Sequence, residues 1–228
     1  MKVYKVLLFY LLCGIGFISC INFNPDKKER NQQTESVDIQ VNKHDDVAMA
    51  RSTHLKFKGV PIDGTLEMFM GRMKHSGFEI EESDEGVAVL SGDFADFKEC
   101  SVYVETLDRK NLVYRISVQF PSQDQWGLLY GDYKHLKNLL IEKYGKPSSC
   151  VEKFQGNSSR MPKDDYDKMH DVKFDRCEYE TRFTVKNGEI VLWIQHAESI
   201  LGEKCFVMLS YIDKENSETI RKHALDDL

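Results

Sequence analysis

Apolar residues recur along the chain with two different periods, which predict helices in some segments and strands in others. Spacings of three and four positions predict a helix over residues 65–75, with Gly77 as its stop, and a longer helix over 126–144. Ser122 and Gln125 have the spacing of a capping box in front of the longer helix.

After each predicted helix the apolar period changes to two, which is typical of β-strands. The predicted strands are 78–82, 87–94, 99–107 and 112–120 after the first helix, and 149–154, 173–185, 189–196 and 205–212 after the second. The pattern predicts an α+β body over 53–228 made of two tandem helix-plus-four-strand antiparallel units, with helices on one face of the sheet. The units would cover about 55–121 and 122–213, and a helix over 216–227 would follow them.

The repeated order indicates an internal duplication. Arg115-Ile116-Ser117-Val118 in the first unit and Met208-Leu209-Ser210-Tyr211 in the second are 93 positions apart, whereas Gly77 and Gly145 are 68 apart. A polar insertion from Gln155 to about Val172 accounts for most of the difference of 25. The halves share little identity, so a chance correspondence is the alternative.

The first twenty residues have the pattern of an export signal. Lys2 and Lys5 precede an uncharged apolar run, Val6 to Ile18, which is shorter than the ~20 residues of a spanning helix. Phe17-Ile18-Ser19-Cys20 then resembles the lipobox of bacterial lipoprotein signals. It implies a signal peptide over 1–19 and a membrane anchor through lipid on Cys20. An uncleaved anchor or ordinary secretion is the alternative.

Residues 20–52 are rich in Asn, Gln, Lys, Asp and Glu and show no sustained apolar period. They predict a flexible tether with a reach of ~30 Å. Ile21 stands where the inner-membrane retention signal of Gram-negative lipoproteins has Asp, which favours the outer membrane as the location. The membrane face, periplasmic or external, is left open.

The composition of the 228-residue chain, 41% hydrophobic and 30% charged, fits a soluble folded body. Lys2 and Lys5 are the only charged residues before Cys20, so the chain from Cys20 onward has 29 basic and 37 acidic residues, a net charge of −8. No basic stripe is visible. The sequence therefore excludes nucleic acid as the expected partner.

Four cysteines lie in the predicted body, and export places them where disulfides are allowed. Cys150 and Cys177 fall on strands expected to be neighbours, which predicts a disulfide between them. Cys100 shares a strand face with Val102 and Val104, and Cys205 shares one with Val207 and Leu209, so both are expected to be buried free thiols. No C-x-x-C spacing indicates redox chemistry or a zinc site.

The motifs of common enzymes are missing from the sequence. It has neither an H-E-x-x-H zinc motif nor the G-x-S-x-G turn of hydrolases, and no catalytic residue, cofactor or metal is predicted.

The insertion carries five candidate metal ligands, but it lacks the glycine and glutamate of an EF-hand and is expected to be a solvated loop. These residues are Asp164, Asp165, Asp167, His170 and Asp171. The alternative is a carboxylate-dependent hydrolase or glycan-acting envelope enzyme using Glu105, Glu178 or Glu180.

A binding surface is the stronger functional hypothesis. Alternation places four residues of types common at protein interfaces on the sheet face away from the predicted helices. These binding-face candidates are Tyr103, Arg115, Arg182 and Trp193. Alternatively, Trp193 and Phe206 fill a second small core.

Several strings, "GTLEMFMGRMKHSGF", "EKYGKP", "KMHDVKFDRCEYET" and "ALDDL", resemble those of small uncharacterised envelope lipoproteins of Gram-negative bacteria. The arrangement of tandem units resembles the β-lactamase-inhibitor-protein-like architecture. These resemblances imply a fold and an envelope location but no chemistry. We expect a non-catalytic, lipid-anchored envelope protein that binds a protein or ligand partner.

Overall fold

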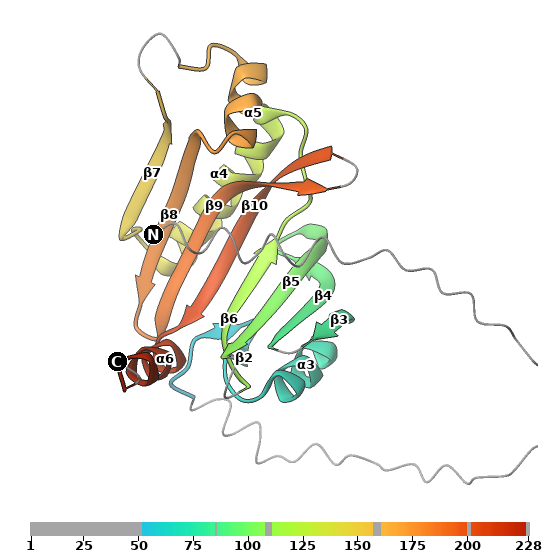
Figure 1. Cartoon of the computed structure of the whole chain (residues 1–228), viewed down its shortest axis with the longest axis vertical. Helices are drawn as coiled ribbons and strands as arrows, with labels where there is room; N and C mark the ends of the chain where they lie inside the picture. Colours follow the sequence, from blue (N-terminus) through green and yellow to red (C-terminus); the bar gives the residue numbers. More distant parts are fainter. Residues whose placement is uncertain (1–51, 85, 108–110, 157–160, 200–201, 227–228) are drawn as a thin grey trace, which may run out of the picture. The chain divides into compact units, whose positions relative to one another are not determined.

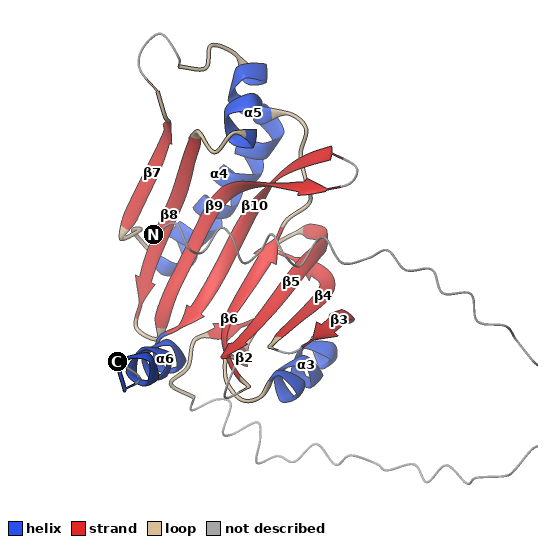
Figure 2. Cartoon of the chain, viewed as in Figure 1, coloured by secondary structure: helices blue, strands red, loops and turns tan. Residues whose placement is uncertain are grey.

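The structure is a computed structural model, and it describes residues 52–84, 86–107, 111–156, 161–199 and 202–226. The predicted signal peptide, Cys20 and nearly all of the predicted tether lie outside the described residues. The described part is α+β, with an eight-stranded antiparallel sheet, a two-stranded hairpin and four helices (Figures 1 and 2). The α+β class and the antiparallel sheet are as predicted.

The elements follow the predicted order closely. The first group is β1 (Lys56–Phe57), β2 (Val60–Pro61), α3 (Leu66–His75), β3 (Glu79–Asp84), β4 (Val87–Phe94), β5 (Phe97–Leu107) and β6 (Leu112–Gln119). The second group is α4 (Trp126–Tyr144), β7 (Ser149–Phe154), α5 (Asp165–Lys173), β8 (Cys177–Val185), β9 (Gly188–Ser199), β10 (Gly202–Asp213) and α6 (Lys214–Asp226).

The strand order across the large sheet is β3-β4-β5-β6-β10-β9-β8-β7. Strands that are consecutive in the chain are neighbours except at the centre, where β6 pairs with β10. There Ser117 lies directly opposite Ser210, and the two hydroxyl oxygens are 2.6 Å apart. Strands β3 and β7 form the two edges of the sheet (Figure 2).

The first two predicted helices form for the expected reasons, with one exception at a cap. The Thr65 hydroxyl accepts a hydrogen bond from the Met68 amide at the start of α3, and Phe69 and Met73 are fully buried. Helix α4 buries five residues on one side. The predicted capping box is wrong, because Gln125 occupies the cap position of α4 without a capping side-chain hydrogen bond.

The polar insertion contains a helix where a solvated loop was expected. Helix α5 begins after Asp164, whose carboxylate accepts a 2.8 Å hydrogen bond from the Asp167 amide. Met169 and Val172, three positions apart, are buried in the core. Because α5 ends at Lys173, strand β8 begins at Cys177 rather than at residue 173 as predicted.

The main hydrophobic core contains residues of the helices and of the sheet. Helix α4 contacts the sheet directly, since the buried Tyr133 hydroxyl lies 2.6 Å from the Thr181 hydroxyl of β8. Buried residues from α3, α5 and the sheet belong to the same cluster. Among the described residues, no helix has the length and apolar character needed to cross a membrane.

Candidate functional site

The four predicted binding residues lie on a single face of the sheet. Residues paired directly across antiparallel strands point to the same side. Tyr103 pairs with Ser117, Ser117 with Ser210, Ser210 with Val191, and Val191 with Arg182. This row of pairs crosses five strands and connects two of the predicted residues.

Trp193 and Arg115 lie in the two rows of paired residues that flank the row from Tyr103 to Arg182. Trp193 pairs with Glu180 and Met208, and Arg115 pairs with Glu105. Thr181, which contacts α4, points to the opposite side by alternation. We call the surface away from Thr181 the distal face. It comprises Tyr103, Glu105, Arg115, Ser117, Gln119, Glu178, Glu180, Arg182, Glu189, Val191, Trp193, Gln195, Phe206, Met208 and Ser210.

The two arginines of the distal face are each held by carboxylates. Arg182 Nε is 2.6 Å from Glu180, and Arg182 Nη1 is 3.1 Å from Glu189. The hydrogen bond from Arg182 to Glu180 raises the pKa of Arg182 above its usual range, despite an opposing effect of burial. Arg115 Nη1 is 3.3 Å from Glu105. The guanidinium groups are thus oriented and their charge is balanced locally, so this face lacks the unbalanced positive charge of an anion site.

The two aromatic residues are fixed in the same way by amide side chains. The Tyr103 hydroxyl donates a 3.0 Å hydrogen bond to Gln119, and the Trp193 indole donates one of 2.7 Å to Gln195. Burial raises the pKa of Tyr103, which keeps the phenol protonated at physiological pH. Both side chains are half-buried. Their polar ends are satisfied within the protein, so their rings are held in defined positions.

The distal face also has a small apolar centre. Phe206, Met208 and Val191 are buried, yet they lie outside the main hydrophobic cluster. Phe206 is therefore buried apart from the main hydrophobic cluster. Trp193 is less buried than Phe206. The face combines a buried apolar centre with half-buried aromatic and arginine side chains around it.

Each carboxylate considered for catalysis forms an ion pair with an arginine or lysine side chain. Glu105 pairs with Arg115, Glu180 with Arg182, and Glu178 with Lys153 at 3.0 Å. Glu105 and Glu180 are also four strand spacings apart, about 19 Å, which exceeds the separation of a glycosidase pair. The three carboxylates therefore form ion pairs with basic side chains of the sheet.

The predicted disulfide between Cys150 and Cys177 is not formed. Their strands β7 and β8 are neighbours as expected, but Cys150 pairs with Thr181 and Cys177 with Phe154. This register separates the cysteines by four positions along the strands, about 13 Å. Cys100, Cys150, Cys177 and Cys205 are free thiols, of which Cys100 and Cys205 are buried.

Cys150 instead belongs to a polar cluster on the helix side that the sequence did not reveal. The Cys150 sulfur lies 3.8 Å from Lys137 Nζ of α4 and 3.5 Å from the Thr181 hydroxyl. Lys137 also forms an ion pair with Glu152. The cluster fastens the edge strand β7 to α4 through side chains from three elements.

The acidic residues of the insertion have structural partners. Asp164 caps α5, Asp165 binds Lys168 at 2.9 Å, and Asp171 binds Arg176 at 2.7 Å. In the described part of the chain, no group of three or more His, Cys, Asp and Glu side chains is arranged to hold a metal ion.

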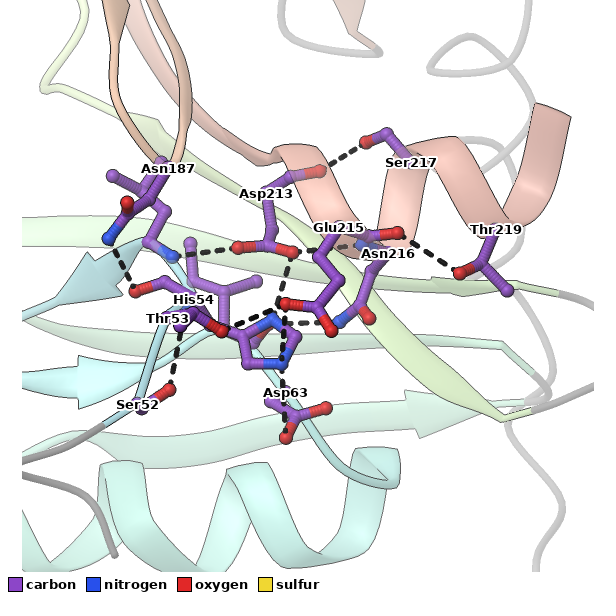
Figure 3. A network of polar contacts seen from close by, with 12 residues as sticks. Ser52, Thr53, His54, Asp63, Asn187, Asp213, Glu215, Asn216, Ser217 and Thr219 are labelled. Carbon is purple, nitrogen blue, oxygen red and sulfur yellow. Dashed lines mark hydrogen bonds and ion pairs between the residues drawn. The ribbon is translucent and has the colours of Figure 1, made fainter.

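A second polar network, which sequence reasoning missed, lies where the described body begins (Figure 3). His54 is surrounded by Asp63, Asp213 and Glu215. His54 and Asp213 are 159 positions apart and form part of no sequence motif. Only the fold brings them together.

Comparison of the chain with protein-family models, with curated proteins and with solved structures finds no significant match.

Proposed function

We propose that this protein is a non-catalytic, lipid-anchored envelope protein whose distal face binds a protein or envelope ligand. The proposed anchor is a lipid on Cys20, followed by the predicted tether up to residue 52, and the proposed location is the outer membrane. The lipobox-like Phe17-Ile18-Ser19-Cys20 and the polar composition after it support the anchor.

One observation carries the binding proposal. Tyr103, Arg115, Arg182 and Trp193 come from four different strands, and strand pairing brings them onto one face in adjacent rows. Each is held by a partner side chain while remaining half-buried. Aromatic and arginine side chains fixed before binding lose little conformational entropy when a partner arrives, which favours affinity.

The same pairing supports the proposal that the body consists of two duplicated units. The strand order is symmetric about the β6–β10 contact, with one helix preceding β3–β6 and another preceding β7–β10. Ser117 and Ser210, which are 93 positions apart, meet at that centre. We further propose that the helices cover one face, as in the β-lactamase-inhibitor-protein-like architecture, which leaves the distal face for a partner.

Site-specific photo-crosslinking in cells tests the binding proposal. A photoreactive phenylalanine analogue replaces Trp193 in the full chain, and the same analogue replaces Lys134, exposed on α4, as the matched control. We expect a discrete crosslinked adduct from position 193 that Arg182→Ala weakens and that position 134 does not give. The same adduct from both positions, or none from position 193, would rule out the distal face as the binding surface.

Metabolic labelling tests the anchor separately. A clickable fatty acid should label the wild-type chain, and Cys20→Ser should abolish the label and shift the protein out of the membrane fraction. An unlabelled wild-type chain beside labelled lipoprotein controls would contradict the anchor without affecting the binding proposal.

A further inference from the structure

His54 lies among three carboxylates that come from three parts of the fold (Figure 3). His54 Nδ1 is 3.0 Å from Asp213 Oδ2, while Nε2 is 3.6 Å from Asp63 Oδ2 and 3.7 Å from Glu215 Oε2. Asp63 follows β2, Asp213 ends β10, and Glu215 is in the first turn of α6. We call these four residues the entry clasp.

Asp213 is the buried centre of the entry clasp. Its side chain is fully buried, and its carboxylate accepts hydrogen bonds from the Leu55 amide at 2.7 Å and the Asn216 amide at 2.9 Å. The second bond caps α6, because the Asn216 amide lies three positions after Asp213. A buried carboxylate is costly unless it is paired and hydrogen-bonded, and His54 supplies the pairing when it is protonated.

The clasp fastens the start of the described body to elements distant in sequence. The Thr53 hydroxyl donates a 2.9 Å hydrogen bond to Glu215, and the Asn187 side chain donates one of 3.4 Å to the His54 carbonyl. The Leu55 amide is held by Asp213 as described above. Residues 53–55 are therefore attached to α6, to the end of β10 and to the turn between β8 and β9.

We propose that a proton on His54 closes the entry clasp, which holds residues 53–55 against β10 and α6 while the imidazole is charged and loosens when it is neutral. The charged groups that face the ring are all acidic: Asp63, Asp213 and Glu215. A charged imidazole satisfies three carboxylates at once. A neutral one leaves the buried Asp213 without its ion pair.

The pKa of His54 sets the pH range of this change. Burial alone would lower the pKa, but the hydrogen bond and charge of Asp213, with the charges of Asp63 and Glu215, raise it above its ordinary value of about 6.5. The stabilisation is therefore complete below about pH 6.5 and is lost as the pH rises through the folded-state pKa. The predicted tether ends at residue 52, next to the entry clasp. The protonation of His54 would therefore control how firmly residues 53–55 are held. It does not depend on binding by the distal face.

Hydrogen exchange of the full chain across a pH series, corrected for the intrinsic exchange rate, tests the proposal. The Leu55 and Asn216 amides both donate to Asp213, so their protection is expected to fall several-fold as His54 loses its proton. Val102, buried in β5, is the internal reference and should keep its protection over the same range.

Two variants make the test specific. Glu215→Gln removes one of the charges that raise the pKa of His54, so the loss of protection should move to lower pH. His54→Gln should remove the pH dependence, and His75→Gln on α3 should leave it unchanged. Constant protection of Leu55 and Asn216 in the wild type, or an unchanged midpoint in Glu215→Gln, would overturn the proposal even if His54→Gln failed to fold.

Discussion

Ser117 and Ser210 are 93 positions apart in the chain, yet their hydroxyl oxygens lie 2.6 Å apart at the centre of the sheet. Both side chains are buried. Ser117 is also within 3.4 Å of Glu105, so Ser210 can donate to Ser117 while Ser117 donates to Glu105. This short relay joins β10 to β6 and, through Ser117, to β5.

Removing the Ser117 hydroxyl should leave the buried Ser210 hydroxyl without this partner, and removing the Ser210 hydroxyl should leave Ser117 with only the longer hydrogen bond to Glu105. We expect Ser117→Ala or Ser210→Ala to lower the free energy of unfolding by about 1–3 kcal/mol, measured by urea denaturation. The double variant removes both polar groups and should cost less than the sum of the single variants. Strictly additive effects would mean that the two hydroxyls do not interact.

The thiols should react according to their burial rather than as a bridged pair. Burial raises the pKa of Cys100 and of Cys205 to about 11, so both stay protonated near neutral pH. Alkylation of the folded protein without reduction should therefore label Cys150 readily and should label Cys100 and Cys205 only after unfolding. Peptide mass mapping that finds Cys150 and Cys177 unlabelled and linked would contradict the strand register described above.

Gly188 is needed for the close contact between β9 and the end of β10. A Cβ atom at this position would lie 2.1 Å from the Ile212 carbonyl oxygen, and Gly188 pairs with Asp213 of the entry clasp. Gly188→Ala should lower the free energy of unfolding by about 1–3 kcal/mol or more.

Gly131 in α4 provides the matched control, because a Cβ atom there would meet nothing within 4 Å. Gly131→Ala should raise the free energy of unfolding by about 0.5–1 kcal/mol, since alanine is the better helix former. Equal stability of the Gly188→Ala variant and the wild type would refute the close contact.

Arg182→Ala should leave the fold intact, as the crosslinking experiment requires. The ion pairs of Arg182 are partly exposed, and pairs of this kind contribute about 0–1 kcal/mol. Thermal unfolding should show a small loss that shrinks further in high salt, because salt screens exposed charges. A large, salt-independent loss would show that Arg182 is mainly a structural residue.

The strands could be predicted from the sequence because their side chains alternate between the core and the opposite face. Residues 87–94 and 149–154 match β4 and β7 at both ends. Helix α5 was missed because Met169 and Val172 are its only buried apolar residues, too few for a periodic signal in a polar segment. Alternation also placed the binding candidates on one face, which the strand pairing reproduces.

Contacts that depend on register or on distant pairing could not be predicted in this way. Neighbouring strands were correctly expected for Cys150 and Cys177, but a shift of four positions along them separates the thiols. The entry clasp joins His54 to Asp213 across almost the whole described chain. No sequence motif or periodicity marks these residues. They meet only in the folded protein, where the Asp213 carboxylate is buried and His54 pairs with it.

The central pairing of β6 with β10 has a consequence for synthesis of the chain. Strands β3–β6 can form hairpins with their neighbours as they leave the ribosome, whereas β6 must wait for β10, the last strand made. Until then β6 presents a free edge of backbone groups beside Val113, Ile116 and Val118. A nascent or truncated chain that ends before β10 is therefore the form in which this protein is most exposed to aggregation.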